Sequence, residues 1–182
     1  MALLIGCMLL LGWIMTTDIL LDGPGKSIAL HIHESLGMII LGLGVLRLMW
    51  RFTNRPPQLP SSMPRWERLA AHIGHTVLYI LLIAMPLVGW GIISTFPHNA
   101  LFFGLFPISN LPVLPELPNK KDIRAILINI HWTLAWVILG FVALHAGAAL
   151  KHHFIERDDI LLRMAPRFLA KGLRYLRGET GT

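Results

Sequence analysis

Charge and cysteine are scarce in this sequence. Only 14% of its 182 residues are charged, whereas a soluble domain carries about 25% charged residues. Hydrophobic residues make up 54% of the chain. This composition excludes a disordered chain and argues against a single water-soluble globule. With Cys7 as its one cysteine, the chain can form neither an intrachain disulfide nor a CxxC site.

Acidic residues are scarcer than basic ones, so the net charge is positive. The chain has 16 Lys and Arg residues against 10 Asp and Glu residues, which gives +6. A nucleic-acid-binding protein can have that balance, but not with so few charges and so much leucine and isoleucine. We therefore interpret the surplus as a topology signal that faces an anionic membrane surface.

Long apolar runs occupy most of the chain. They lie at residues 1–17, 27–50, 69–95 and 123–150. A membrane-spanning helix needs about 20 apolar residues, so the length suits four spans, of which the first is slightly short. No positively charged segment precedes the first run, which argues against a secretory signal peptide. The sequence thus predicts an all-α, integral membrane four-helix bundle, with one domain over 1–182 and a basic tail at 151–182.

Basic residues are distributed unevenly between the two ends of the predicted helices. Twelve lie between Arg47 and Arg68 or between Lys151 and Arg177. The other four lie at the opposite ends, and they are Lys26, Lys120, Lys121 and Arg124. The positive-inside rule places the larger set, and with it the C-terminal tail, in the cytoplasm. The loop at 96–124 contains five prolines and is predicted to be an irregular outer cap.

Histidine is frequent for so apolar a chain, with nine residues. Ionisable residues inside membrane spans are energetically unfavourable and are therefore functional candidates. His33 and His131 lie at similar depths from the outer ends of the second and fourth segments, so we expect them to meet across the helix interface. His145 follows His131 by 14 residues, which is about 21 Å along a helix, and both point to nearly the same face.

Two imidazoles on one stripe, one near each membrane surface, suit two stacked haems. A b-type haem takes a neutral imidazole on each side of its iron, so His33, His131 and His145 are the predicted metal ligands. Gly37 and Gly44 follow His33 on the same helix face. We predict that they leave space for a porphyrin edge; the alternative is that they only let the helices pack closely.

Further polar residues lie toward the predicted inner surface. Arg47 either pairs with a haem propionate or a quinone oxygen, or is an anchor that snorkels to the surface. His72 and His75 open the third segment, and His152 and His153 follow the fourth. Such residues either exchange protons with a quinone or are solvated, and for His152 we expect the solvated state.

The remaining histidines are expected to play no part in cofactor binding. His31 points away from His33 by about 200° on a helix, and His98 lies in the outer loop. The tail from Arg163 onward is basic and weakly amphipathic. It either lies along the inner membrane surface or is a solvated end.

Taken together, these motifs resemble the bacterial cytochrome b561 family of four-helix dihaem membrane proteins. The matching stretches are HESLG at 33–37, AHIGH at 71–75 and LHAGAALKHHFIERDDILLRMAPR at 144–167. The resemblance implies two b-type haems. It also implies that His33 and His131 hold the outer haem, and that His145 holds the inner haem with a histidine near the start of helix one.

Residues 1–17 contain no histidine. Three explanations are open. The sequence begins at an internal methionine of a longer protein, which we favour, or it is truncated, or the inner haem is absent, five-coordinate or held by another residue such as His75. We therefore expect an incomplete inner site that binds haem more weakly.

The predicted function is that of an oxidoreductase that transfers electrons between two haems across the bacterial inner membrane. The resemblance adds a quinone as partner and, for some members, oxidation of superoxide at the outer face, where the four outer basic residues would attract a small anion. One alternative is the haem-carrying membrane subunit of a dehydrogenase or hydrogenase complex, with a soluble redox partner. Another is a membrane di-iron oxygenase, for which the histidines are too few and too deep.

Overall fold

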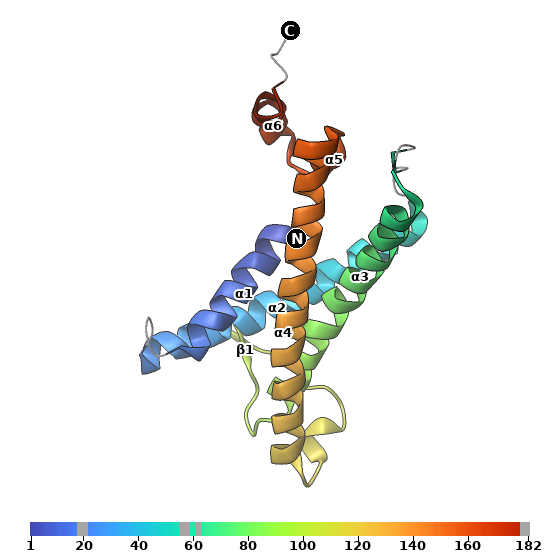
Figure 1. The fold of residues 1–182 in the computed structure, drawn as a ribbon. Coiled ribbons are helices and arrows are strands. Elements are labelled where there is room, and N and C mark those ends of the chain that lie inside the picture. The colour runs from blue at the N-terminus through green and yellow to red at the C-terminus, as the bar shows by residue number, and fades with distance from the viewer. Residues whose placement is uncertain (18–21, 55–58, 61–62, 179–182) are drawn as a thin grey trace. The chain divides into compact units, whose positions relative to one another are not determined.

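The computed structural model describes residues 1–17, 22–54, 59–60 and 63–178, and its regular structure is almost entirely helical (Figure 1). The main helices are α1 (Ala2–Thr16), α2 (Gly23–Thr53), α3 (Arg65–Ser94) and α4 (Lys120–Lys151). They coincide with the four predicted apolar segments, which confirms the all-α prediction. Arg55 and residues 18–21, which belong to the predicted loops, lie outside the described residues.

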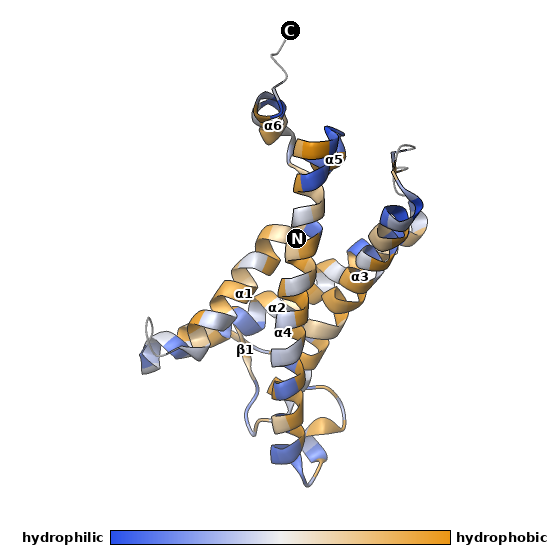
Figure 2. Cartoon of the chain, viewed as in Figure 1, coloured by the Kyte–Doolittle hydropathy of each residue, from blue (hydrophilic) through white to orange (hydrophobic). Residues whose placement is uncertain are grey.

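Three of these helices, α2, α3 and α4, are long and apolar enough to cross a membrane. Large apolar side chains such as Leu46, Ile80 and Leu144 are exposed on them, as expected of helices whose solvent is lipid. Polar residues gather toward the ends of α3 and α4 (Figure 2). Helix α1 has 15 residues, which is about 22 Å and less than the roughly 30 Å of a hydrocarbon core.

Local sequence signals explain where the helices begin and how they continue. Asp22 caps α2, because its side chain accepts a hydrogen bond from the Gly25 N–H, and Pro24 occupies the first turn, where no N–H is needed. Helix α3 continues through Pro86, which membrane helices tolerate. Helix α4 carries Asp122 in its first turn and Lys151 in its last, and both charges favour the helix dipole.

The described residues form two compact units. The first comprises residues 1–57 and 75–138, and the second comprises residues 58–74 and 139–182. Two of the three boundaries fall inside helices, after residue 74 in α3 and after residue 138 in α4. The single membrane domain stays a prediction. In the first unit, α1 packs along α2.

The segment between α3 and α4, which we call the cap (residues 95–119), has little regular structure, as its prolines predict. Strands β1 (Leu101–Phe102) and β2 (Phe106–Pro107) pair antiparallel, and a 3-10 turn follows at Leu114–Glu116. A small apolar core is buried beneath it, built from Ile93, Ala100 and Ile108 with Met38, Trp90 and Phe102 packed around them.

Hydrogen bonds from buried serines attach the cap to the helices. Ser35 of α2 donates to the His31 carbonyl and accepts from the Phe103 N–H. Ser94 of α3 donates to the Trp90 carbonyl and accepts from the Leu111 N–H. Both serines are fully buried. The cap is therefore held in one place by side chains of α2 and α3.

At its C-terminal end α4 passes into a π-helical turn at His152–Glu156, which ends at Arg157 in the left-handed conformation (φ 56°). A short helix α5 (Ile160–Met164), a 3-10 turn at Arg167–Leu169 and helix α6 (Ala170–Leu176) follow. All of these belong to the second unit.

Candidate functional site

His33 and His131 meet inside the first unit, as predicted. His33 is the eleventh residue of α2 and His131 the twelfth of α4. Their ring centroids are 6.2 Å apart, and the ring planes cross at 68°. The structure thus brings together two imidazoles that are 98 residues apart in the sequence.

The arrangement of the two rings favours metal binding between them over a purely structural role. The Nδ1 atom of each ring is buried and has no hydrogen-bond partner, which is unfavourable for a polar atom in an apolar interior. A metal–imidazole bond is about 2 Å long, so rings at this separation leave room for one ion. Metal binding at one nitrogen of each ring would leave the other to donate to a nearby acceptor.

Two glycines that sequence analysis did not select lie against these rings. A Cβ added at Gly12 of α1 would lie 3.5 Å from the His33 Cε1, and one added at Gly89 of α3 would lie 3.3 Å from the His131 Cε1. The absence of a side chain at each position lets the ring lie close to the neighbouring helix. Among 16 glycines, no signal in one sequence identifies these two, because the helix pairing is needed to find them.

The two glycines that we did predict have different surroundings. A Cβ added at Gly44 would lie 3.1 Å from Ile83 Cδ1 and 3.2 Å from Leu82 Cγ. Side chains of α3 thus lie beside Gly44, as close helix packing requires, and the porphyrin contact predicted there stays a prediction. A Cβ at Gly37 would lie 3.9 Å from the Met8 Cε of α1, so Gly37 faces α1.

The other predicted ligand, His145, lies in the part of α4 that belongs to the second unit. Its side chain is half-buried. An added Cβ at Gly147, two residues later and therefore on the opposite face of the helix, would meet nothing within 4 Å. Arg47 lies in the first unit, on the exposed side of α2. The roles predicted for both stay predictions.

The histidines predicted to exchange protons with a quinone fall into different environments. His72 is exposed, and its Nδ1 lies 2.7 Å from the Arg68 carbonyl one turn earlier. His75 is also exposed. His153 is fully buried, and its Nε2 lies 3.0 Å from the Leu173 carbonyl of α6. The structure thus places His153 beneath α6, while its predicted cofactor contact stays untested.

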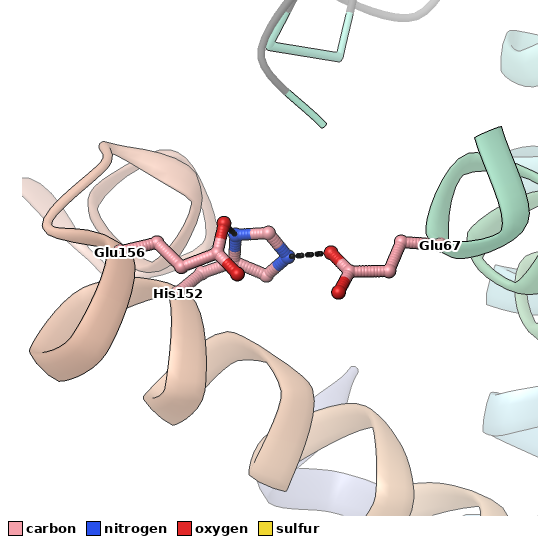
Figure 3. A group of neighbouring side chains, drawn as sticks. All are labelled: Glu67, His152 and Glu156. Carbon is pink, nitrogen blue, oxygen red and sulfur yellow. Dashed lines mark ion pairs between the residues drawn. The ribbon is translucent and has the colours of Figure 1, made fainter. Parts of the chain in front are cut away.

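The expectation that His152 is solvated was wrong. Its side chain is 8% exposed and lies between Glu67 of α3 and Glu156 of the π-helical turn (Figure 3). The His152 Nδ1 is 2.7 Å from Asp158 Oδ2, and its Nε2 is 3.6 Å from Glu67 Oε2. The physical reason is that the surrounding carboxylates supply partners for a ring that burial would otherwise leave unpaired.

This cluster is an ion-pair network. Glu67, His152 and Glu156 place one potential ligand atom each within 4.8 Å of one another. The Lys151 ammonium, however, already contacts both carboxylates, at 2.5 Å from Glu67 and 2.7 Å from Glu156. Because this cation already occupies the space between the two carboxylates and offsets part of their charge, the arrangement does not favour a metal ion.

A cavity of about 610 Å³ at the cap end is lined by Lys120, Lys121 and Arg124 together with Asp122, Thr95, Pro97, Pro118 and Asn119. Arg124 donates to the Thr95 carbonyl and hydroxyl and lies 3.8 Å above the Phe96 ring. Lys120 donates to the Pro115 carbonyl. Arg124 and Lys120 thus donate to neutral oxygen atoms of the cap. These hydrogen bonds hold the cap in place but do not compensate the positive charges of the two side chains.

Comparison with known proteins places this chain among bacterial membrane cytochromes. A family model described as prokaryotic cytochrome b561 matches residues 1–167. The chain is 35% identical to cytochrome b561 homolog 2 of Escherichia coli (strain K12) over 164 residues, which cover 90% of this chain and 84% of that protein. It is also 35% identical to cytochrome b561 homolog 1 of the same organism over 137 residues, covering 74% and 73% of the two chains.

A third relative carries a more specific name. A Yersinia pestis protein named as a probable superoxide oxidase is 35% identical over 138 residues, which cover 75% of this chain and 74% of that protein.

Proposed function

Because the chain belongs to the prokaryotic cytochrome b561 family of membrane electron-transfer proteins that bind b-type haem, we propose that it carries electrons through a haem held between His33 and His131. The observation that carries this proposal is the meeting of two half-buried imidazoles whose buried Nδ1 atoms lack hydrogen-bond partners. A b-type haem supplies reversible one-electron chemistry at its iron.

The residues around the pair would hold the haem and tune it. His33 and His131, from α2 and α4, would supply neutral imidazole ligands. Gly12 and Gly89 keep the rings close to α1 and α3. The apolar helices exclude water, and a low-dielectric surrounding is one of the means by which a protein sets a haem potential.

The second haem would use His145, which lies near the other end of α4. Arg47, which is exposed on α2, would pair with a propionate or a quinone oxygen. Residues 1–17 supply no histidine, so this site would be weaker than the first. In this proposal the chain spans the inner membrane and its C-terminal tail lies in the cytoplasm. His145 then belongs to the inner haem.

A quinone would accept or donate the electrons near the inner end. His72, His75 and His153 stay the predicted contacts. The network of Glu67, His152 and Glu156 adds titratable groups in the second unit, and such groups allow protons to follow electrons. A soluble redox partner protein would be recognised by its co-purification with the chain.

A more specific proposal than electron transfer is that the protein oxidises superoxide at the cap end. It is supported by the name of the Yersinia pestis relative and by the charges of Lys120, Lys121 and Arg124 around one cavity. Positive charge raises the local concentration of a small anion and speeds its association. With Lys26, these are the four outer basic residues of the chain.

The test of the haem proposal is a reduced-minus-oxidised absorption spectrum of the purified protein and three alanine variants. We expect His33→Ala and His131→Ala to lose the b-type band of one haem while the protein still inserts into the membrane. The matched control, His98→Ala, removes a histidine of the cap and should leave the spectrum unchanged. An unaltered band in His131→Ala, or no b-type band in the parent protein, would refute the proposal.

A further inference from the structure

Helix α6 and the turn before it expose large apolar side chains, and the proposed electron transfer does not explain this exposure. Phe168 is 81% exposed, Tyr175 74% and Leu176 64%. The segment lies beyond the 1–167 stretch that matches the family model. Phe168 and Tyr175 are seven residues apart, so in a helical segment they lie on one face two turns apart.

Two anchors on its other face tie α6 to the end of the spanning helix. The fully buried His153 contacts the Leu173 carbonyl through its Nε2. Arg177, whose side chain is 6% exposed, donates to the Asp158 carbonyl and to the Asp159 carboxylate. The exposed face of α6 is therefore the one that points away from these anchors.

The attachment point is close to the membrane surface. The apolar run of α4 ends at Leu150, and His153 follows three residues later. Three residues advance a helix by about 5 Å, which lies within the headgroup layer of roughly 5–8 Å on each side of the hydrocarbon core. Helix α6 is thus held at headgroup level and cannot move far into the aqueous phase.

The basic side chains of α6 indicate what kind of surface the helix contacts. Lys171 and Arg174 are exposed beside the apolar face, whereas α6 itself has no acidic residue. A helix with an apolar face bordered by basic residues is typical of one that lies in the interface of an anionic membrane. We propose that the exposed face of residues 168–176 docks on the anionic lipid surface of the membrane that the chain spans.

The experiment measures the surroundings of α6 in the full-length protein. A Cβ added at Gly172 would meet nothing within 4 Å, so Gly172→Cys in a Cys7→Ser background accepts an environment-sensitive fluorophore and keeps Phe168 and Tyr175. The labelled protein is placed in nanodiscs of phosphatidylcholine, or of phosphatidylcholine with phosphatidylglycerol. Gly140→Cys, an equally open position within α4, gives the lipid-exposed reference.

We expect the Gly172 label to be blue-shifted and protected from aqueous iodide only in the anionic nanodiscs, and to be quenched there by brominated lipid. Lys171→Gln and Arg174→Gln should each lower the ratio of docked to undocked label by about fivefold. Neither substitution touches the anchors at His153 and Arg177. The matched control, Lys121→Gln at the cap end, should have no effect.

Equal iodide access in both kinds of nanodisc would overturn the proposal, and so would equal protection in both. Protection that appears in native membranes but not in anionic nanodiscs that hold only the purified labelled protein would also overturn it, because another protein would then cover the face. The b-type spectrum of each sample reports the haem separately, so failure of this proposal is distinguishable from failure of the haem proposal.

Discussion

His33 and His131 differ from the other histidines of the chain in what surrounds their rings. His152 has carboxylate partners and His153 has a backbone carbonyl, whereas the rings of His33 and His131 face each other and lie against two glycines. Like these two rings, His153 has an unpartnered Nδ1, but two imidazoles that face each other are what a shared metal ion needs. The surroundings, more than the residue type, separate the candidate ligands from the structural histidines.

The tight contact at Gly89 leads to a prediction at this scale. Gly89→Ala would place a methyl group 3.3 Å from the His131 ring, so the ring must shift by a few tenths of an ångström. Crowding of this kind is unfavourable by about 1–3 kcal/mol. We expect the variant to lose haem about fivefold or more faster than the parent, as measured by transfer of haem to apomyoglobin.

Gly12→Ala is the matched control, because its added methyl group would lie 3.5 Å from the His33 ring, at an ordinary contact distance. It should lose haem at the parent's rate. If both variants lose haem equally fast, or if neither does, the Gly89 contact does not position His131.

At the scale of elements, the cap depends on a few buried hydroxyl groups. Its strands have two residues each, so backbone pairing alone cannot hold it. Ser35 and Ser94 replace that pairing with bonds from α2 and α3 to backbone N–H groups of the cap. The cap is therefore attached to α2 and α3 by side-chain hydrogen bonds more than by sheet structure.

We predict that Ser35→Ala loosens the cap. The substitution removes the acceptor of the part-buried Phe103 N–H, and loss of such a hydrogen bond is unfavourable by about 0.5–1.5 kcal/mol. The expected result is a lower unfolding temperature and faster cleavage of the cap by a protease. Ser27→Ala is the control, since the Ser27 hydroxyl is exposed and bonds only to a carbonyl of its own helix. Equal effects of the two substitutions would contradict this role of Ser35.

At the scale of the whole molecule, haem stoichiometry tests whether the two sites differ. His145 is the predicted ligand for which residues 1–17 offer no histidine partner. We expect the 182-residue chain to bind less than two haems per protein, measured by the pyridine haemochrome assay. His131→Ala should reduce the ratio more than His145→Ala. A ratio of two in the parent chain would contradict the incomplete inner site.

Most of the fold could be predicted from the sequence, because apolar run length decides which segments can span a membrane. The four segments and the depths of His33 and His131 follow from counting residues along helices. The surroundings of Gly44 and His152 could not be predicted. Whether Gly44 faces side chains or open space depends on the rotation of α3, and whether His152 is solvated depends on where Glu67 lies, 85 positions earlier in the chain.

The sequence by itself determined that this is a helical membrane protein and which histidines lie at cofactor depth, because both follow from hydropathy and from the rise per residue of a helix. Only the tertiary structure decided which helices pack against the His33 and His131 rings through a glycine. It also decided that Lys151 and His152 share a carboxylate cluster, and that α6 is anchored beside α4. These are contacts between residues far apart in the chain, and close packing selects them from many that the same pattern allows.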